Sequence, residues 1–268
     1  MRPIVMTINA SDPTGQTGIA ADLAVFRTHR LATQCVVTAV QGPSELYPLP
    51  TTVVGGELSV ALREAAPAAV KLGVLGTGEV ASSIAAYMRD RLRNVVLDPE
   101  LDARLGHHQG VVAAILRLLP LATVVTPSVE EASALVGWPI VSTADMAGAA
   151  AQLASLGTPH IVITGGGLGG DECVDAVWTP TGTRFMRSPR IDAPNTRGAG
   201  CMFSAMITAN LARGRGAMEA ITLAKEHVTR ALTAAAAHAR DVAQSAAWTP
   251  QLVPIRTATD ERSPAHAA

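Results

Sequence analysis

The heptapeptide Asn195-Thr196-Arg197-Gly198-Ala199-Gly200-Cys201 leads directly into the apolar segment Met202–Ile207. This segment predicts a helix that ends at Arg213, because the next residue, Gly214, is typical of the position just past a helix C-terminus. The two glycines permit positive φ angles and close approach to the backbone, so successive N–H groups can point into one small space. The helix adds unpaired N–H donors and the positive end of its dipole. Residues 198–200 therefore predict an anion hole suited to a phosphoryl group in transit.

Cys201 stands at the mouth of this predicted anion hole, and we expect it to be catalytic together with Gly198, Ala199 and Gly200. A helix N-terminus and nearby loop donors stabilise a thiolate, so we expect a lowered pKa. An unperturbed thiol, with a pKa of ~8.5, is mostly protonated at neutral pH. Positioning and electrostatics should therefore supply most of the rate. The local pattern alone fits an ordinary tight loop with a buried cysteine equally well.

Elsewhere in the chain, short β-rich runs alternate with helical patterns. Strands are predicted at Ile4–Asn9, Gln34–Val40, Ala69–Val74, Val95–Asp98, Thr123–Thr126 and His160–Thr164, and helices near Gly18–Arg30, Glu57–Ala65, Glu79–Leu92, Gly110–Leu119, Val129–Val136 and Ala144–Leu156. The strands are apolar throughout, which is typical of a mostly parallel sheet with helices on both faces. Runs Glu172–Trp178 and Thr183–Ser188 predict a small antiparallel hairpin at the sheet edge.

The C-terminal part of the chain is expected to be helical and then irregular. A long alanine-rich helix is predicted over Ala217–Arg240. The segment 243–268 is rich in Thr, Pro, Ser and Ala without periodicity, so we expect a loosely ordered tail. The rest, residues 1–242, shows no internal repeat and no break in composition. It is predicted to form a single α/β domain.

Composition excludes several classes of protein. The 268 residues carry a net charge of −1 without a block of Lys or Arg, so a nucleic-acid partner is not expected. Only 3% of the residues are aromatic, which argues against a base-stacking surface. Three scattered cysteines are too few for a disulfide framework or a zinc site. No run approaches the ~20 apolar residues of a membrane span. We therefore expect a soluble, cytoplasmic protein with no membrane contact.

Small polar residues and glycines follow five of the predicted strands. In an open α/β sheet, ligands bind beyond the carboxyl ends of the strands. These ends lie at residues 9–18, 71–78, 97–99, 126–128 and 164–167. They predict one continuous rim that accepts a nucleotide and a small substrate.

From Ile4 to about Ala236, the chain resembles the hydroxymethylpyrimidine and phosphomethylpyrimidine kinases of thiamine synthesis, which belong to the ribokinase superfamily. The motifs that carry the resemblance are Ser11–Leu23, Lys71-Leu72-Gly73, Asp98-Pro99, Thr126–Ala132, Gly165–Leu168 and Asn195–Cys201. The resemblance implies a ribokinase-like fold and transfer of the ATP γ-phosphoryl group, with Mg²⁺, to a hydroxymethyl or phosphomethyl group on a pyrimidine. The implied substrate is 4-amino-5-hydroxymethyl-2-methylpyrimidine or its monophosphate, and the implied assembly is a homodimer. It also implies that Cys201 stands where other ribokinase-type enzymes carry an aspartate base.

The resemblance further implies roles for individual residues. The substrate-binding residues would be Gly18, Asp22, Gln41 and Val74, the nucleotide-binding residues Ser128, Thr164 and Gly166, and the residues near magnesium Asp98 and Glu131. The residues themselves leave simpler alternatives open. Asp22 fits a solvated helix carboxylate, Glu131 forms a capping box with Ser128, and Asp98 before Pro99 is typical of a turn.

The chain also departs from the pattern of this family. Gly15-Gln16-Thr17-Gly18 replaces a Gly-Gly-Ala-Gly loop, and Pro43 stands where the family has a glutamine that reads the pyrimidine edge. Ser128 replaces an asparagine, and Thr164 replaces a lysine that would offer a positive charge to phosphate. These changes keep two alternatives open. The protein would act on another heterocycle, such as a pyridoxal-like ring, or would bind a ligand without catalysis.

Overall fold

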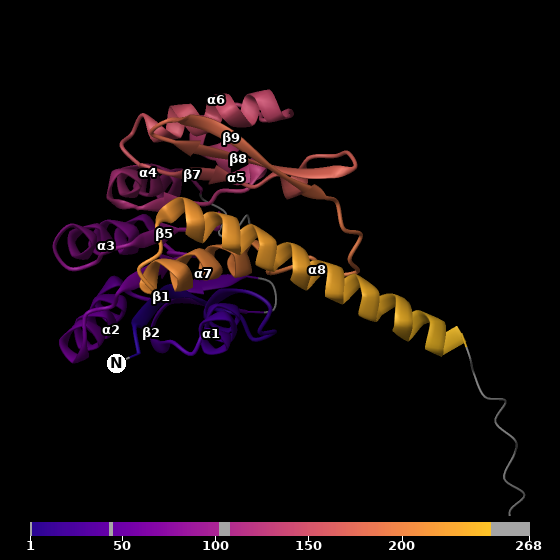
Figure 1. Cartoon of the computed structure of the whole chain (residues 1–268). Helices are drawn as coiled ribbons and strands as arrows, with labels where there is room; N and C mark the ends of the chain where they lie inside the picture. Colours follow the sequence, from indigo (N-terminus) through magenta and orange to yellow (C-terminus); the bar gives the residue numbers. More distant parts are fainter. Residues whose placement is uncertain (1, 43–44, 102–107, 248–268) are drawn as a thin grey trace, which may run out of the picture.

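The computed structural model describes residues 2–42, 45–101 and 108–247, and all its strands in these ranges belong to one nine-stranded sheet (Figure 1). The strand order is β3-β2-β1-β4-β5-β6-β7-β8-β9. The strands are β1 Ile4–Ser11, β2 Ala32–Gln41, β3 Leu46–Pro48, β4 Ala69–Leu72, β5 Val95–Leu97, β6 Val124–Val125, β7 Ile161–Ile163, β8 Glu172–Thr179 and β9 Gly182–Pro189. The strands from β2 to β7 pair in parallel, as expected. Antiparallel pairs close the two edges, β2–β3 at one side and β7–β8–β9 at the other.

Helices cover both faces of the sheet, which confirms the predicted fold class (Figure 1). They are α1 Gly18–Thr28, α2 Thr51–Glu64, α3 Gly78–Asp90, α4 His108–Leu118, α5 Val129–Val136, α6 Thr143–Ala154, α7 Ala199–Ala212 and α8 Ala217–Ala247. One core, under α2 to α6, receives Met6 and Ile8 of β1. The other core, under α1, α7 and α8, receives Val5 from the opposite face of the same strand. Both sides of β1 are buried, so its first half is apolar on both faces, whereas Thr7 and Asn9 alternate with apolar residues in its second half.

Several predicted boundaries were wrong. Strand β3 was not predicted. Helix α2 begins at Thr51, directly after Pro50, rather than at the predicted Glu57. Strand β4 ends at Leu72 rather than Val74, and the next residue, Gly73, lies so close to the Asn9 side chain that a Cβ there would come within 2.4 Å of it. The helix α8 runs to Ala247, so residues 243–247 of the predicted tail are helical. Residues 248–268 lie outside the described residues.

The loop before α7 packs tightly on the loop after β1. Gly198 has a φ angle of +84°, and a Cβ there would lie 2.1 Å from the carbonyl oxygen of Gln16. Only glycine fits both conditions at this position. Arg197 pairs with Asp12 across the two loops, with 3.7 Å between the guanidinium nitrogen and the carboxylate oxygen. Burial alone would raise the pKa of Asp12, but hydrogen bonds from Thr17 and Thr14 lower it to about 2. The first motif, Ser11–Leu23, therefore holds in place the loop that precedes α7.

Among the described residues, no helix combines the length and the apolar character that crossing a membrane requires.

Candidate active site

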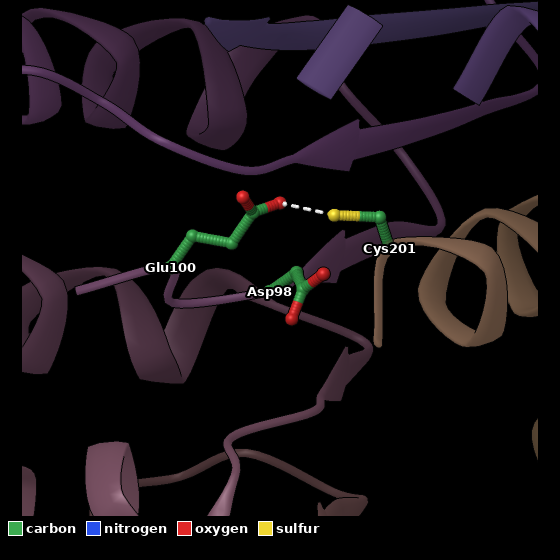
Figure 2. A group of neighbouring side chains, drawn as sticks. All are labelled: Asp98, Glu100 and Cys201. Atoms are coloured by element: carbon green, nitrogen blue, oxygen red, sulfur yellow. Dashed lines mark hydrogen bonds between the residues drawn. The ribbon is translucent and has the colours of Figure 1, made fainter. Parts of the chain in front are cut away.

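The first turn of α7 separates two polar regions. Cys201 is the third residue of this helix and is buried, with 5% of its surface exposed. It faces the carboxylates of Asp98 and Glu100, which follow β5 (Figure 2). Gly200, one residue earlier, is exposed and lines a cavity on the other side of the helix. Cys201 therefore lies at the start of a helix, as predicted, and it faces acidic side chains that were not predicted to lie there.

A fully buried lysine holds the carboxylate cluster together. Lys71 of β4 has no exposed surface, and its ammonium nitrogen lies 2.5 Å from Asp22, 3.6 Å from Asp98 and 3.8 Å from Glu100. Burial by itself would lower the pKa of Lys71. The carboxylates around it reverse this and raise the pKa well above its ordinary value. Lys71 is therefore a buried cation that its carboxylate neighbours keep charged.

Asp22 is not the open carboxylate that substrate binding would need. It is fully buried on α1, where Thr7 donates a hydrogen bond to it at 2.6 Å and Asn9 donates another at 3.1 Å. Its other oxygen accepts from Lys71. The alternative of a solvated helix carboxylate is wrong, because α1 turns Asp22 toward β1 and β4 and away from solvent. In this structure Asp22 fixes the position of Lys71.

Cys201 is a hydrogen-bond donor rather than a stabilised thiolate. Its thiol donates to Oε1 of Glu100 with 3.1 Å between sulfur and oxygen (Figure 2). Burial raises the pKa of Cys201 well above its ordinary value, Lys71 opposes this, and Glu100 and Asp98 add to it. The expected lowering of the thiol pKa is therefore wrong. The helix dipole acts locally, whereas the opposing carboxylates come from a distant part of the chain.

Glu100 itself is a perturbed acid. Burial raises its pKa to about 7, and the neighbouring Asp98 and Asp22 add to the rise while Lys71 opposes it. It lies two residues after Asp98, beyond the end of β5. A carboxylate with this pKa exchanges protons near neutral pH. Glu100 thus accepts the hydrogen bond of a thiol that holds its own proton more tightly than Glu100 does.

Asp98 and Glu131 are close enough for their charges to interact. Asp98 accepts hydrogen bonds from Ser204 at 2.7 Å and from Thr126 at 3.2 Å. Glu131 forms the full capping box with Ser128 at the start of α5, so the local alternative holds. Burial raises the pKa of Glu131 to about 8, and Asp98 contributes the next largest part of the rise. The two acids therefore repel each other, and a hard cation with oxygen ligands would relieve that repulsion.

On the other side of α7, a cavity of about 260 Å³ lies between the hairpin β8–β9 and α8. Thr164 and Gly166, both predicted to bind nucleotide, line it together with Ala199 and Gly200. Ser128 does not belong to this wall. Its hydroxyl accepts from the Glu131 N–H, and its backbone forms an isolated parallel bridge with Thr164. Ser128 thus supports the loop that carries Thr164.

The remaining predicted substrate residues surround the end of β1. Gly18 starts α1 with a φ angle of +62°, and a Cβ there would lie 2.2 Å from the carbonyl oxygen of Ala10. Val74 is buried in a small cluster with Ala10 beneath the β2–β3 hairpin. Gln41 is half-buried at the end of β2, where it pairs with Leu46 of β3. Pro43 lies outside the described residues. Gly18 and Val74 therefore both pack against Ala10 near the end of β1.

Comparison with known proteins identifies the family. The family model for phosphomethylpyrimidine kinase matches residues 12–245. The chain belongs to the phosphomethylpyrimidine kinase family.

The chain is similar to two curated relatives and to one solved structure. A hydroxymethylpyrimidine/phosphomethylpyrimidine kinase of Haemophilus influenzae is 35% identical over 243 residues, which cover 85% of this chain and 90% of that one. A pyridoxine kinase of Bacillus subtilis is also 35% identical, over 85% of this chain and 89% of that one. The structure of the pyridoxal kinase of Staphylococcus aureus in complex with AMP-PCP and pyridoxal superposes with a TM-score of 0.79. The two chains are 30% identical in sequence, and the match covers 85% of this chain and 87% of that one.

Sequence reasoning missed several polar residues of this family member. Glu100, Asn9, Thr7 and Ser204 belong to the carboxylate cluster, and Lys225 belongs to the cavity wall. Two of them carried a signal in the sequence. Thr7 and Asn9 are polar residues inside the apolar first strand, so a polar partner was to be expected there. Glu100 and Lys225 carried none, because their environments come from segments distant in sequence.

Proposed function

We propose that this member of the phosphomethylpyrimidine kinase family transfers the γ-phosphoryl group of ATP to the hydroxymethyl group of 4-amino-5-hydroxymethyl-2-methylpyrimidine, or phosphorylates its monophosphate. The observation that carries the proposal is the first turn of α7. Gly200 opens there onto the cavity lined by Thr164 and Gly166, and Cys201 faces the carboxylate cluster. A phosphoryl group at this turn would have the nucleotide on one side and the proton acceptor on the other.

In this mechanism the backbone N–H groups of Gly198 and Gly200 bind the equatorial oxygens of the transferring phosphoryl group. The Ala199 N–H, expected to join them, instead donates to the carbonyl oxygen of Thr196 at 3.1 Å. The attacking substrate hydroxyl gives its proton to the sulfur of Cys201. The thiol proton of Cys201 passes to Oε1 of Glu100, 3.1 Å away. Cys201 thus remains neutral throughout, which fits its raised pKa. Lys71 offsets the negative charge that the cluster holds.

We also propose that Asp98 and Glu131 hold Mg²⁺. Their donor atoms are carboxylate oxygens, which suit a small hard cation, whereas the nearby Cys201 sulfur does not. The raised pKa of Glu131 supports this proposal, because a cation would offset the repulsion from Asp98. When bound, magnesium supplies positive charge to the phosphate oxygens.

A pyridoxal-like ring is a second candidate substrate. The pyridoxine kinase of Bacillus subtilis is as similar to this chain as the hydroxymethylpyrimidine/phosphomethylpyrimidine kinase of Haemophilus influenzae, at 35% identity each. In addition, the side chain that could replace the family glutamine, Gln41, stands two residues before Pro43. A pocket that lacks one polar partner discriminates less between rings.

A direct test incubates the protein with Mg-ATP and a panel of rings: the hydroxymethylpyrimidine, its monophosphate, pyridoxal and pyridoxine. Mass spectrometry then measures added phosphate. We expect phosphorylation of the pyrimidine, with pyridoxal as a slower second substrate. Phosphorylation of pyridoxal alone would favour the second candidate, and no phosphorylated product from any ring would contradict both. The predicted homodimer is checked by light scattering on the purified protein, and its cytoplasmic location by cell fractionation.

A further inference from the structure

Cys173 of β8 lies against a primary amine. Its sulfur accepts a hydrogen bond from Nζ of Lys225 on α8, with 3.5 Å between the sulfur and nitrogen atoms. The chain has only two lysines among its 21 Lys and Arg residues, and Lys71 is held in the carboxylate cluster. Lys225, the other lysine, is thus placed where a thiol and an amine can react with each other.

Asp175 brings a carboxylate to both of these groups. Residues two apart on a strand point to the same side, so Cys173 and Asp175 both reach Lys225. Oδ2 of Asp175 lies 2.8 Å from the nitrogen of Lys225, and Oδ1 lies 3.9 Å from the sulfur of Cys173. A proton that leaves the ammonium or the thiol therefore has an acceptor beside it.

A small molecule can reach both reacting atoms from the cavity between the hairpin β8–β9 and α8. Cys173 and Lys225 are partly exposed, and both line this cavity, whose volume of about 260 Å³ has room for several water-sized molecules. Cys201, by contrast, is only 5% exposed, and its thiol is engaged by Glu100. Dioxygen therefore has access to Cys173 and to the amine beside it.

We propose that Cys173 and Lys225 form a covalent bridge through one oxygen atom, Sγ–O–Nζ, on exposure to dioxygen. The bond between the two atoms of dioxygen breaks, and so do the S–H bond and two N–H bonds of the ammonium. One oxygen atom then joins sulfur to nitrogen, and the other leaves as water. Sulfur and nitrogen give up two electrons each, and dioxygen takes all four.

The hydrogens of this reaction also balance. The thiol and the ammonium carry four hydrogens between them. One stays on the bridging nitrogen, two leave in the water, and one leaves as a proton. Asp175, whose Oδ2 lies 2.8 Å from the nitrogen, is placed to accept that proton.

The bridge would fasten β8 to α8 and act as a reversible redox response. It joins positions 52 residues apart, and the segment between them includes α7. A cross-link that closes a long loop stabilises a protein mainly by restricting the unfolded chain. A thiol reductant attacks the oxidised sulfur, as it does in other reversible oxidation products of cysteine. We therefore expect the oxidised protein to be the more stable form and reduction to reverse the effect.

The test compares the full chain incubated in air with the same protein kept anaerobic in dithiothreitol. The bridge adds one oxygen and removes two hydrogens, so intact-mass spectrometry should find a gain of about 14 Da. Peptide mapping should place Cys173 and Lys225 in one cross-linked product. Tm should rise by at least about 4 °C, and dithiothreitol should restore both the mass and the Tm.

Three variants assign the reaction to this pair. Lys225→Arg keeps the positive charge beside Asp175 and lacks a primary amine, and Cys173→Ser lacks the sulfur, so neither should form the cross-link. Cys35→Ser removes the exposed thiol of β2 and should form it as the wild type does.

A wild-type protein that keeps its mass in air would overturn the inference, and so would one that gains oxygen without losing two hydrogens. A cross-linked product in Lys225→Arg would contradict it as well. None of these measurements uses ATP, so each of these results would leave the proposed kinase function intact.

Discussion

Replacing Gly200 with alanine should make the protein more stable and less active. Gly200 is the second residue of α7, and a Cβ built there meets no atom within 4 Å. The new methyl group therefore has room in the free protein. It would occupy the side of the helix that lines the cavity, where the proposed function places the phosphoryl group. Stability and activity should thus change in opposite directions.

The size of both effects follows from general magnitudes. A glycine-to-alanine change that introduces no strain stabilises a protein by roughly 0.4–1 kcal/mol. For a chain of this length each kcal/mol shifts Tm by about 2–4 °C, so we expect a rise of about 1–4 °C. A phosphate displaced by ~1 Å from the reacting geometry loses on the order of 100-fold in rate. We expect a loss of kcat of that order.

The assay pairs thermal unfolding with the rate of ADP release under saturating Mg-ATP and substrate. Gly56→Ala is the matched control, because Gly56 is an exposed residue within α2 and a Cβ there also meets nothing within 4 Å. It should raise Tm and keep wild-type turnover. Gly198→Ala should lower Tm, since its Cβ would collide with Gln16. A Gly200→Ala variant with full turnover would refute the placement of the phosphoryl group at this turn.

Three further changes test the carboxylate cluster. Cys201→Ala should lower kcat by about 100-fold or more, because it removes a proton-transfer group. Its affinity for ADP, measured by calorimetry, should be nearly unchanged. Wild-type turnover in this variant would exclude a role for Cys201 in proton transfer. The pKa of Glu131 is raised from an ordinary 4.5 to about 8, so the folded protein holds the Glu131 proton more tightly than the unfolded chain does. Protonated Glu131 therefore stabilises the fold fully below pH ~4.5, and this stabilisation is lost as the pH rises to ~8. In urea unfolding, Glu131→Gln should therefore lose less stability than the wild type between pH 5 and 8, and an equal loss would show that Glu131 does not titrate in this range. Lys71→Met should cost about 3–5 kcal/mol in the same assay, because it leaves Asp22 buried without its partner, and the double variant with Asp22→Asn should recover part of this loss.

The fold could be predicted from the sequence because local patterns and global packing agree. Apolar strands alternate with helical patterns, and this alternation allows few arrangements other than a parallel sheet covered on both faces. The misplaced start of α2 has a local cause. Gly55 and Gly56 lower the helix propensity of its first half, and packing of Val54 and Leu58 on the sheet overrides it. The short strand β3 has only three residues and no alternation long enough to detect.

The site could be predicted only in part. The position of Cys201 at the start of α7 follows from the glycines before it, but its protonation state does not. That state depends on Glu100, which lies 101 residues earlier and contacts the thiol only after β5 and α7 have packed together. For Lys71 a signal was present in the sequence. A lysine within a short run whose other residues are Ala, Val and Leu is expected to be buried, and a buried lysine requires a carboxylate partner.

Helix geometry explains why one turn can serve both halves of the proposed reaction. Successive residues of an α-helix differ by about 100° in direction, so neighbours in the sequence face different surroundings. Gly200 faces the cavity and Cys201 faces Glu100, and the helix N-terminus with its free N–H groups lies between them. A shift of α7 by one residue would turn the thiol toward the cavity and away from its acceptor. Gly198 packs the start of the helix against the carbonyl oxygen of Gln16. It therefore sets which residue of α7 faces the cavity and which faces Glu100, and it is as important to the site as Gly200 and Cys201 themselves.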